Sequence, residues 1–370
     1  MISGIKKSLV FRRSLEDDGA VSIKDDMKML RLVPSSQALK SSVSLCLVLT
    51  SSSVLAELPQ AYTVKDIGSL GGYSVPHSID ESGRITGYSY TAAGVRAFSW
   101  TQTGGMVNLG SLGNDKSIAY DSNETGEVVG TSIVNGQYRG FIWRADTGMT
   151  AVPCPPAATC SARGINSEGV VTGYTQIPGG PYRPFRWSGG DSLDYLPTLG
   201  GAHAYGAGIN ADGSVTGVAY TADPLPHAFV SDEAGQLRDL GSLDGSTSYG
   251  KAINSLGHAV GYGADRGNKG AFFWSPELGM VALGTLGGPN SYAKGINSED
   301  VVVGQSQTGA RATGFVWTAA TGMLDLNQML LGEEVWFITA ALDVNDSGQI
   351  TGFGKDSRGR IRTLLLNPVY

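Results

Sequence analysis

Polar side chains recur at one position of a regularly spaced pattern along this chain. An Asn or Asp stands at residues 80, 123, 166, 210, 254, 297 and 345, in steps of 43, 43, 44, 44, 43 and 48 residues. Three residues before these positions, five of the seven side chains are basic or aromatic: His77, Tyr120, Arg163, Lys251 and Lys294. If the pattern gathers them in one place, they would form a pocket for an acidic sugar or a carboxylate. Alternatively, they hydrogen-bond to loops or to acidic residues of neighbouring turns.

A second periodic set of basic residues lies just before the small residue that begins an aromatic run. Its members are Arg96, Arg139, Arg183 and His227. They are secondary candidates for ligand contact, with the same structural alternative. Tyr205, Tyr249 and Tyr292 each stand five residues before their Asn, where they could stack on a sugar or pack within the repeat.

The case for enzymatic chemistry is weak. The chain has only four His residues, no two of them at metal-ligand spacing, and it lacks a Gly-x-Ser-x-Gly elbow, a phosphate loop and an Asp-rich calcium loop. We therefore predict no catalytic residue, no metal and no cofactor. A carbohydrate lyase or hydrolase would need paired carboxylates or a Tyr/His pair at one place, and the available cluster is Asp121, Asp343, His77 and Tyr120.

The elements that would position these residues follow from the repeat itself. In most copies the Asn is followed three residues later by Gly, which is typical of a hairpin turn, and then by a Val-rich strand such as 128–132. A third strand carries Phe and Trp two residues apart, as in Phe141 and Trp143, so that both lie on one strand face. A fourth strand opens at Gly-Met and closes on Leu-Gly-x-Leu-Gly-Gly, as at 283–288. A period of about 43 residues with four strands is typical of a propeller blade.

The strand count predicts how the ring closes. The seventh repeat lacks its fourth strand, and one unpaired strand of that type occurs at 62–68. We predict an all-β, seven-bladed β-propeller with four-stranded blades, closed when strand 62–68 completes the last blade and removes the open edge. Most residues two and four positions before each Asn or Asp are small, which is expected if the first strands converge near an axis and leave little room for side chains. The alternative, a β-helix, would have shorter coils and no need of this strand exchange.

The first 56 residues lie outside the repeat. Lys28, Arg31 and Lys40 precede an apolar, Ser-interrupted run at 43–55, and this order predicts a signal peptide over 27–56 with cleavage after Ala56. The alternative is a retained membrane helix, but the run is short and rich in Ser and Thr. Residues 1–26 fit no export signal and are interpreted as a start codon assigned too far upstream, leaving 57–370 as the propeller.

Cysteine usage and charge agree with export. Cys154 and Cys160 are separated by five residues, which favours a loop-closing disulfide, with two free thiols as the alternative. Removing the leader's eight Lys and Arg and five Asp and Glu from the totals of 27 and 33 leaves 19 basic and 28 acidic residues. Such an acidic chain is a poor partner for nucleic acid. We expect an extracellular or periplasmic monomer without membrane insertion after signal cleavage.

The chain resembles the HAF-repeat proteins, a family of predicted extracellular bacterial repeat proteins. His227-Ala228-Phe229 spells the eponymous triplet, and Leu-Gly-x-Leu-Gly-Gly, Ile-Asn-x-x-Gly and Phe-x-Trp recur in order over residues 62–366. The resemblance implies repeats and export, and it implies no reaction or substrate.

These observations predict an exported binding or scaffold propeller that recognises a protein or a cell-surface glycan. Two alternatives remain: a carbohydrate-active lyase or hydrolase with an axial site, and a purely structural envelope or matrix protein.

Overall fold

The computed structural model describes residues 58–113, 115–309 and 311–370. The predicted upstream segment 1–26 and the predicted signal peptide 27–56 lie outside the described residues. Within the described part, no helix is long and apolar enough to cross a membrane.

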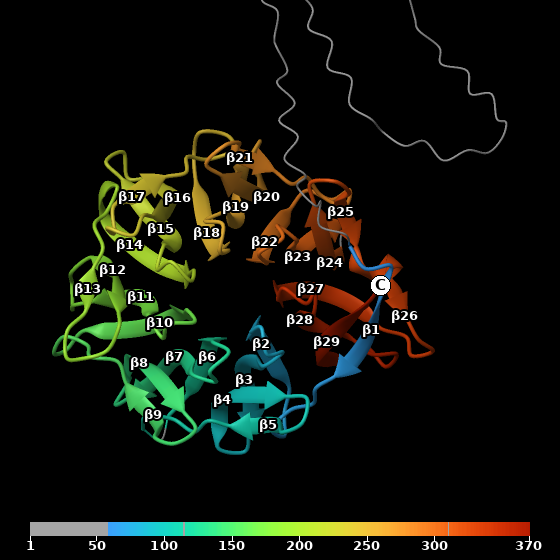
Figure 1. Cartoon of the computed structure of the whole chain (residues 1–370), viewed down its shortest axis with the longest axis horizontal. Coiled ribbons are helices and arrows are strands. Elements are labelled where there is room, and N and C mark those ends of the chain that lie inside the picture. The colour runs from blue at the N-terminus through green and yellow to red at the C-terminus, as the bar shows by residue number, and fades with distance from the viewer. Residues whose placement is uncertain (1–57, 114, 310) are drawn as a thin grey trace, which may run out of the picture. The chain divides into compact units, whose positions relative to one another are not determined.

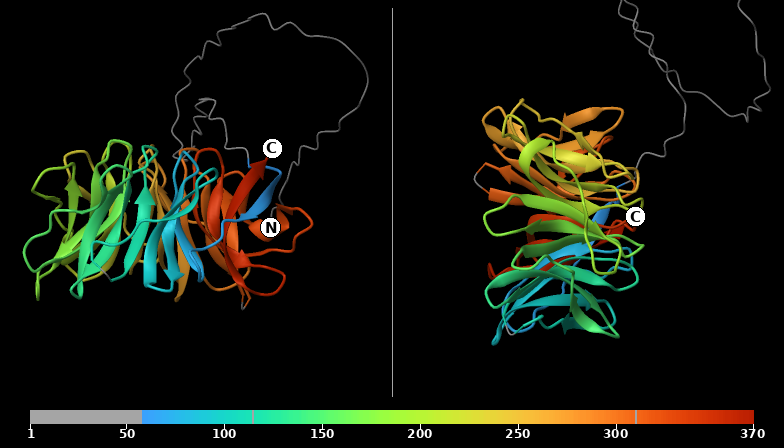
Figure 2. Two further views of the ribbon diagram at one scale, coloured as in Figure 1. Left: turned by 90° about the horizontal axis from the view of Figure 1, so that it is seen from below. Right: turned by 90° about the vertical axis from the view of Figure 1, so that its left-hand side faces the viewer.

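Seven antiparallel sheets are arranged in a ring, with the first strand of each sheet nearest the centre (Figure 1). Seen from the side, the strands run between the two faces of the ring, so that every hairpin turn lies on one face or the other (Figure 2). The predicted seven-bladed β-propeller with four-stranded blades is confirmed.

We number the blades in chain order and give the bounds of their strands. Blades 1 and 2 comprise β2 (Ser74–Ile79), β3 (Ile85–Thr91), β4 (Gly94–Thr101), β5 (Gly105–Asn108), then β6 (Ser117–Ser122), β7 (Val128–Val134), β8 (Gln137–Arg144) and β9 (Gly148–Ala151). Blades 3 and 4 comprise β10 (Thr159–Ile165), β11 (Val171–Gln176), β12 (Tyr182–Trp187), β13 (Asp194–Tyr195), then β14 (Gly200–Ile209), β15 (Val215–Thr221), β16 (Pro226–Ser231) and β17 (Leu237–Asp239). Blades 5 and 6 comprise β18 (Ser248–Ile253), β19 (Ala259–Asp265), β20 (Asn268–Ser275), β21 (Gly279–Ala282), then β22 (Ser291–Ile296), β23 (Val302–Thr308), β24 (Arg311–Thr318) and β25 (Gly322–Asp325).

Blade 7 joins the two ends of the described chain. It consists of β27 (Phe337–Val344), β28 (Ile350–Lys355), β29 (Ile361–Val369) and β1 (Ala61–Asp66). β1 pairs antiparallel with β29, with Val64 opposite Leu366. The predicted closure by the N-terminal strand is therefore confirmed. The short helix η1 (Leu326–Gln328) and strand β26 (Leu330–Leu331), which pairs parallel with β1, were not predicted.

The hydrophobic core lies between neighbouring blades. The third strand of each of the first six blades contributes one fully buried Phe: Phe98, Phe141, Phe185, Phe229, Phe272 and Phe315. Phe141, for example, packs with Ala97 and Leu109 of blade 1 as well as Val128 of its own blade. Each Phe lies against a glycine of the second strand. At Gly130, an added Cβ would come within 2.1 Å of the Ile118 main-chain oxygen, so only glycine fits there.

The repeated Asn residues form a closed ring of hydrogen bonds around the propeller, in addition to the predicted turns. Within a blade, the side-chain oxygen accepts a hydrogen bond from the main-chain N–H four residues on; Ser214 N–H, for example, donates to Asn210 Oδ1 at 2.9 Å. Across each junction from blade 2 onward, the side-chain amide donates to the main-chain oxygen of the equivalent residue in the next blade, at 2.9 to 3.2 Å. At the remaining junction, Asp80 replaces Asn and accepts from the Ser122 hydroxyl at 2.9 Å.

Candidate functional site

A β-bulge in the innermost strand of every blade positions the candidate axial residues. In each blade, pairing between the first and second strands skips one residue at the same position of the repeat, for example between Ala162 and Gly164, and blades 4 and 7 have a further irregularity near the start of the first strand. The skipped residue is the one three before the Asn or Asp. A bulge bends its strand and redirects a side chain. The seven skipped residues are His77, Tyr120, Arg163, Ala207, Lys251, Lys294 and Leu342.

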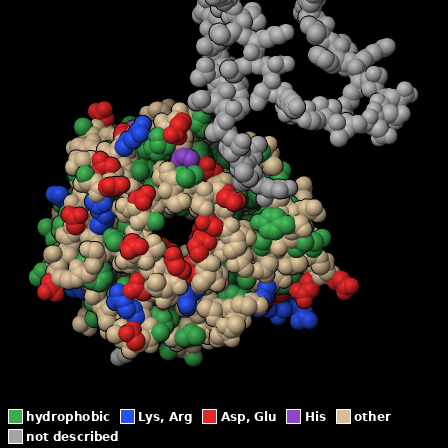
Figure 3. All heavy atoms as spheres, viewed as in Figure 1, with side chains coloured by type: hydrophobic (Ala, Val, Ile, Leu, Met, Phe, Trp, Pro, Cys, Tyr) green, Lys and Arg blue, Asp and Glu red, His purple; other side chains and the backbone are tan. Residues whose placement is uncertain are grey.

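These seven side chains come together around a central channel. They line two adjoining cavities of about 270 Å³ and 610 Å³, which share all seven. The smaller cavity extends toward the Asn turns and includes Glu81 and Glu124. Figure 3 shows acidic side chains gathered around one mouth of the central hole. The larger cavity extends the other way and is lined by Tyr174, Tyr205, Tyr220 and Tyr249.

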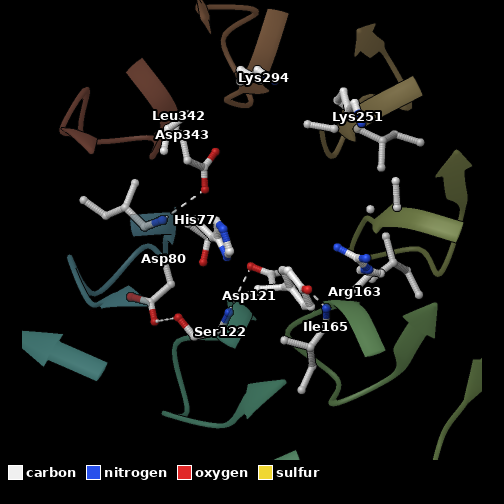
Figure 4. A pocket seen from close by; sticks show the side chains of 18 of the residues that line it. His77, Asp80, Asp121, Ser122, Arg163, Ile165, Lys251, Lys294, Leu342 and Asp343 are labelled. Atoms are coloured by element: carbon white, nitrogen blue, oxygen red, sulfur yellow. Dashed lines mark hydrogen bonds between the residues drawn. The ribbon is translucent and has the colours of Figure 1, made fainter. Parts of the chain in front are cut away.

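Arg163 is held between aromatic rings at the edge of the channel. Its guanidinium carbon lies 3.9 Å from the centre of the Tyr120 ring and 5.4 Å from that of Tyr174. One terminal nitrogen donates to the Tyr174 hydroxyl at 3.1 Å. The Nε atom is buried and has no hydrogen-bond partner among the described residues. In Figure 4 the Arg163 side chain points into the channel.

The two lysines of the channel also lack anionic partners. Among residues 58–113, 115–309 and 311–370, neither the Lys251 nor the Lys294 ammonium forms a hydrogen bond or an ion pair. Both lie near the Tyr262 ring, at 5.4 Å and 5.9 Å from its centre. Burial, with repulsion from Lys294 and Arg163, lowers the pKa of Lys251 to about 8. Burial also lowers the pKa of Lys294.

His77 adds a neutral ring to this group. Burial lowers its pKa to about 4, and the neighbouring Arg163 and Lys294 charges act in the same direction. Its Nδ1 lies 2.7 Å from the Ala119 main-chain oxygen, so Nδ1 carries the hydrogen and Nε2 keeps its lone pair. The ring stacks on Tyr120 with centroids 5.0 Å apart. At neutral pH the positive charge of the ring of seven therefore comes from Arg163, Lys251 and Lys294.

Two carboxylates of the channel connect neighbouring blades. Asp121 accepts the main-chain N–H of Ile165 in the next blade at 3.0 Å, and Asp343 accepts that of Ile79 at 3.0 Å (Figure 4). Burial raises the pKa of Asp121 to about 7 and that of Asp343 well above its usual range, although these hydrogen bonds oppose the shift. These carboxylates thus have structural partners.

The secondary candidates lie away from the channel and connect consecutive blades. Arg96, Arg139 and His227 each contact the main-chain oxygen of the residue eight positions before the next blade's Asn: Asp115, Ala158 and Ser246. His227 also contacts the Asp239 carboxylate at 2.9 Å. These contacts to loop carbonyls and to an acidic residue match the structural alternative of the sequence analysis, in which the basic residues hydrogen-bond within the protein rather than to a ligand. Arg183 instead lines a separate cavity with Ile177 and Tyr195.

The structure also bears on the cysteine pairing. Cys154 and Cys160 form a disulfide, as predicted. Within the described residues, no group of three or more His, Cys, Asp or Glu side chains could hold a metal ion.

Sequence reasoning missed part of the aromatic wall. Of the three tyrosines for which sugar stacking was one alternative, Tyr205 and Tyr249 line the larger cavity and Tyr292 does not. Tyr174 and Tyr220 of the second strands were overlooked. A Gly-Tyr pair recurs in this strand at 87–88, 173–174 and 261–262, and that recurrence could have indicated part of the wall.

Comparisons with known proteins agree on the fold. No protein-family model matches the chain, and no curated protein matches its sequence. Among solved structures, the chain is similar to oligogalacturonate lyase from Vibrio parahaemolyticus, with 11% identity over 82% of this chain and 93% of that one and a TM-score of 0.53. It is also similar to the β-propeller domain of the Trilobed protease from Pyrococcus furiosus, with 8% identity over 84% and 94% and a TM-score of 0.51.

A third similarity covers only part of its counterpart. A puromycin hydrolase structure matches with 14% identity and a TM-score of 0.51, over 78% of this chain and 53% of the hydrolase, so this chain spans about half its length. At such low identities these similarities show a β-propeller fold alone.

Proposed function

We propose that this chain is an exported β-propeller that binds an acidic sugar, or another ligand bearing a carboxylate, in its axial channel. The observation that carries the proposal is the group of three cations from three blades, Arg163, Lys251 and Lys294, without an anionic partner among the described residues. Buried charges are normally paired because burial without a partner is costly. A carboxylate of the ligand would supply that missing partner.

The aromatic half of the channel supports a sugar as the carrier of the carboxylate. Tyr174, Tyr205, Tyr220 and Tyr249 line a cavity of about 610 Å³, within the range typical of small-molecule sites. Tyrosine offers an apolar face for the C–H groups of a sugar and a hydroxyl for its oxygens. Cations beside tyrosine rings therefore suit a uronic acid better than a neutral sugar.

Export is part of the proposal. The Cys154–Cys160 disulfide supports it because such bonds persist in oxidising compartments, and the predicted signal peptide supports it independently. N-terminal sequencing of the protein recovered from an expressing bacterium tests the point. A mature chain beginning at Glu57 is expected, and a chain retained uncleaved in the cytoplasm would contradict it.

Calorimetric titration of the purified protein with galacturonate, and with galactose as the uncharged counterpart, tests binding. We expect galacturonate to bind and galactose not to bind. The triple variant Arg163→Ala, Lys251→Ala, Lys294→Ala should no longer bind galacturonate. The matched control removes three exposed arginines outside the channel: Arg238, Arg266 and Arg311. Equal binding of both sugars, or an equal loss of binding in the triple variant and the control, would refute the axial site. The ligand class is tested separately on an array of acidic glycans and carboxylates. Absence of binding to every member of that array would refute it.

One observation favours a second candidate, a lyase acting on the same ligand class. The unprotonated Nε2 of His77 lies in a cavity that also holds three cations, and such an arrangement could remove a proton next to a neutralised carboxylate. Incubation with oligogalacturonate, the substrate class of one structural neighbour, tests this. New ultraviolet absorbance from an unsaturated product, absent in the His77→Ala variant, would favour the lyase. No change in absorbance would exclude the lyase and leave ligand binding as the proposed function.

A further inference from the structure

A side pocket opens from the axial channel between blades 2 and 3. Its volume is about 360 Å³, and it shares Tyr120, Arg163 and Tyr174 with the larger axial cavity. Tyr138 of blade 2 and Tyr182 of blade 3 form its further walls. The three shared residues form the boundary between the two spaces, so the side pocket adjoins the axial channel.

The lining of this side pocket combines aromatic faces with hydroxyl groups. Tyr138 is 54% exposed, whereas Tyr182 packs against Tyr205 with centroids 4.6 Å apart. At the base, the Thr131 and Ser161 hydroxyls lie 2.7 Å from each other. The volume is at the lower end of the range of about 300 to 1,000 Å³ that is typical of small-molecule sites, which suits one sugar unit.

The Arg163 side chain lies where the two spaces meet. Arg163 lines the side pocket and both axial cavities, and its buried Nε has no hydrogen-bond partner within the described residues. Because the buried Nε is closed to a ligand, a sugar oxygen in either space would reach the guanidinium through a terminal nitrogen.

The loop that enters blade 3 differs from its counterparts. At the entry to blades 1, 2 and 6, the N–H of a Leu in the connecting loop bonds to a second-strand Ser hydroxyl, at 2.9 to 3.1 Å. At the entry to blade 3, the disulfide-closed loop 154–160 stands in that place, and Cys160 lines the side pocket. The cavity therefore occurs at a blade entry that differs from those of blades 1, 2 and 6.

We infer that the side pocket between blades 2 and 3 is a second sugar subsite, so that the ligand is an oligosaccharide rather than a single sugar acid. The inference rests on the proposed function: one unit places its carboxylate among the axial cations, and the neighbouring unit lies against Tyr138 and Tyr182. The separate cavity at Tyr195 shares no axial residue and offers no such continuity.

Titration of the purified protein with galacturonate and with trigalacturonate tests the inference. We expect the trimer to bind more tightly than the monomer. Tyr138→Ala should weaken the trimer about two- to tenfold, the usual value of one aromatic contact, and leave the monomer unchanged. Tyr195→Ala is the matched control, because Tyr195 is also exposed, at 42%, and lines the other cavity.

The outcomes separate the two proposals. If the monomer binds and the trimer binds no more tightly, or Tyr138→Ala weakens both equally, the second subsite is refuted while the axial site stands. If neither sugar binds, the second subsite for galacturonate units is refuted, and the array of acidic glycans and carboxylates decides whether the axial proposal fails too. If Tyr195→Ala weakens the trimer as much as Tyr138→Ala does, the oligosaccharide follows another path and the inference is wrong.

Discussion

The axial site should lose affinity for a carboxylate ligand as the pH rises above 8. Lys251 is the group responsible, because burial and two neighbouring cations lower the pKa of its ammonium to about 8 in the free protein. A bound carboxylate favours the charged lysine and so raises that pKa again. By linkage, the ligand binds the protonated form more tightly, and deprotonation weakens binding.

The expected magnitude follows from the two pKa values. We take about 8 for the free protein and the ordinary 10.5 for the complex, in which the charge is paired. At pH 7 the lysine is mostly protonated in both states, whereas at pH 9 it is protonated almost only in the complex. Affinity should therefore fall about tenfold between pH 7 and pH 9. The carboxylate of a sugar acid stays ionised throughout, so the change belongs to the protein.

Calorimetry with galacturonate at pH 7, 8 and 9 and constant ionic strength measures this slope. Lys251→Arg should remove most of it, because a guanidinium stays charged over this range, and Lys294 should account for the remainder. The effect of pH on the folding stability of the unliganded protein has the opposite sign to its effect on ligand affinity. The unfolded chain binds more protons between pH 8 and 10.5, so this group should make folding stability rise with pH in that window. A wild-type affinity that is constant from pH 7 to 9, or a full slope in Lys251→Arg, would refute the reasoning.

Three further predictions concern the scaffold. Ser122→Ile should lower the free energy of unfolding by about 1.5 to 3 kcal/mol, because the buried Asp80 carboxylate loses its hydroxyl donor. Adding Asp80→Asn should restore most of this loss by recreating the regular repeat at that junction. A coupling energy between the two substitutions of less than about 0.5 kcal/mol, measured by urea unfolding, would contradict this. Reducing the Cys154–Cys160 disulfide should lower the free energy of unfolding by about 2 kcal/mol, from the entropy of a short loop, and unchanged urea midpoints would argue against this. Gly130→Ala should cost more than about 4 kcal/mol or prevent folding, since its Cβ would lie 2.1 Å from a carbonyl oxygen, and a native-like circular dichroism melt would show that the strand adjusts.

The fold was predictable because its period is carried by residues with strong local preferences. Asn and Gly mark each first hairpin, and Phe with Trp marks the third strand, so both turn and strand face could be inferred without knowing any contact. The closure was predictable from a surplus strand at one end and a missing one at the other, which β1 and β29 confirm.

Features that depend on the register between strands or blades were not predictable in the same way. A bulge is a property of two paired strands, and nothing in the identity of Arg163 shows that it is the skipped residue. The Asn ring depends on the distance between blades, although the joint change to Asp80 and Ser122 at one junction does carry a signal of contact. The side pocket arises where Tyr138 of one blade faces Tyr182 of the next, and those residues are 44 positions apart in the sequence.

The repeat also provides an internal control on why the axial charges are there. The position three before the Asn has the same bulged backbone in all seven blades, yet it holds Ala207 in blade 4 and Leu342 in blade 7. The backbone therefore accepts apolar residues at this position, and the fold does not require a cation at any of them. Lys251 and Lys294 bear a cost in the unliganded protein, because burial disfavours both charged forms and repulsion from Lys294 and Arg163 adds to this at Lys251. A costly feature that the scaffold does not need is best explained by the ligand that would pair with it, and Lys251→Leu should accordingly weaken binding while leaving the propeller intact.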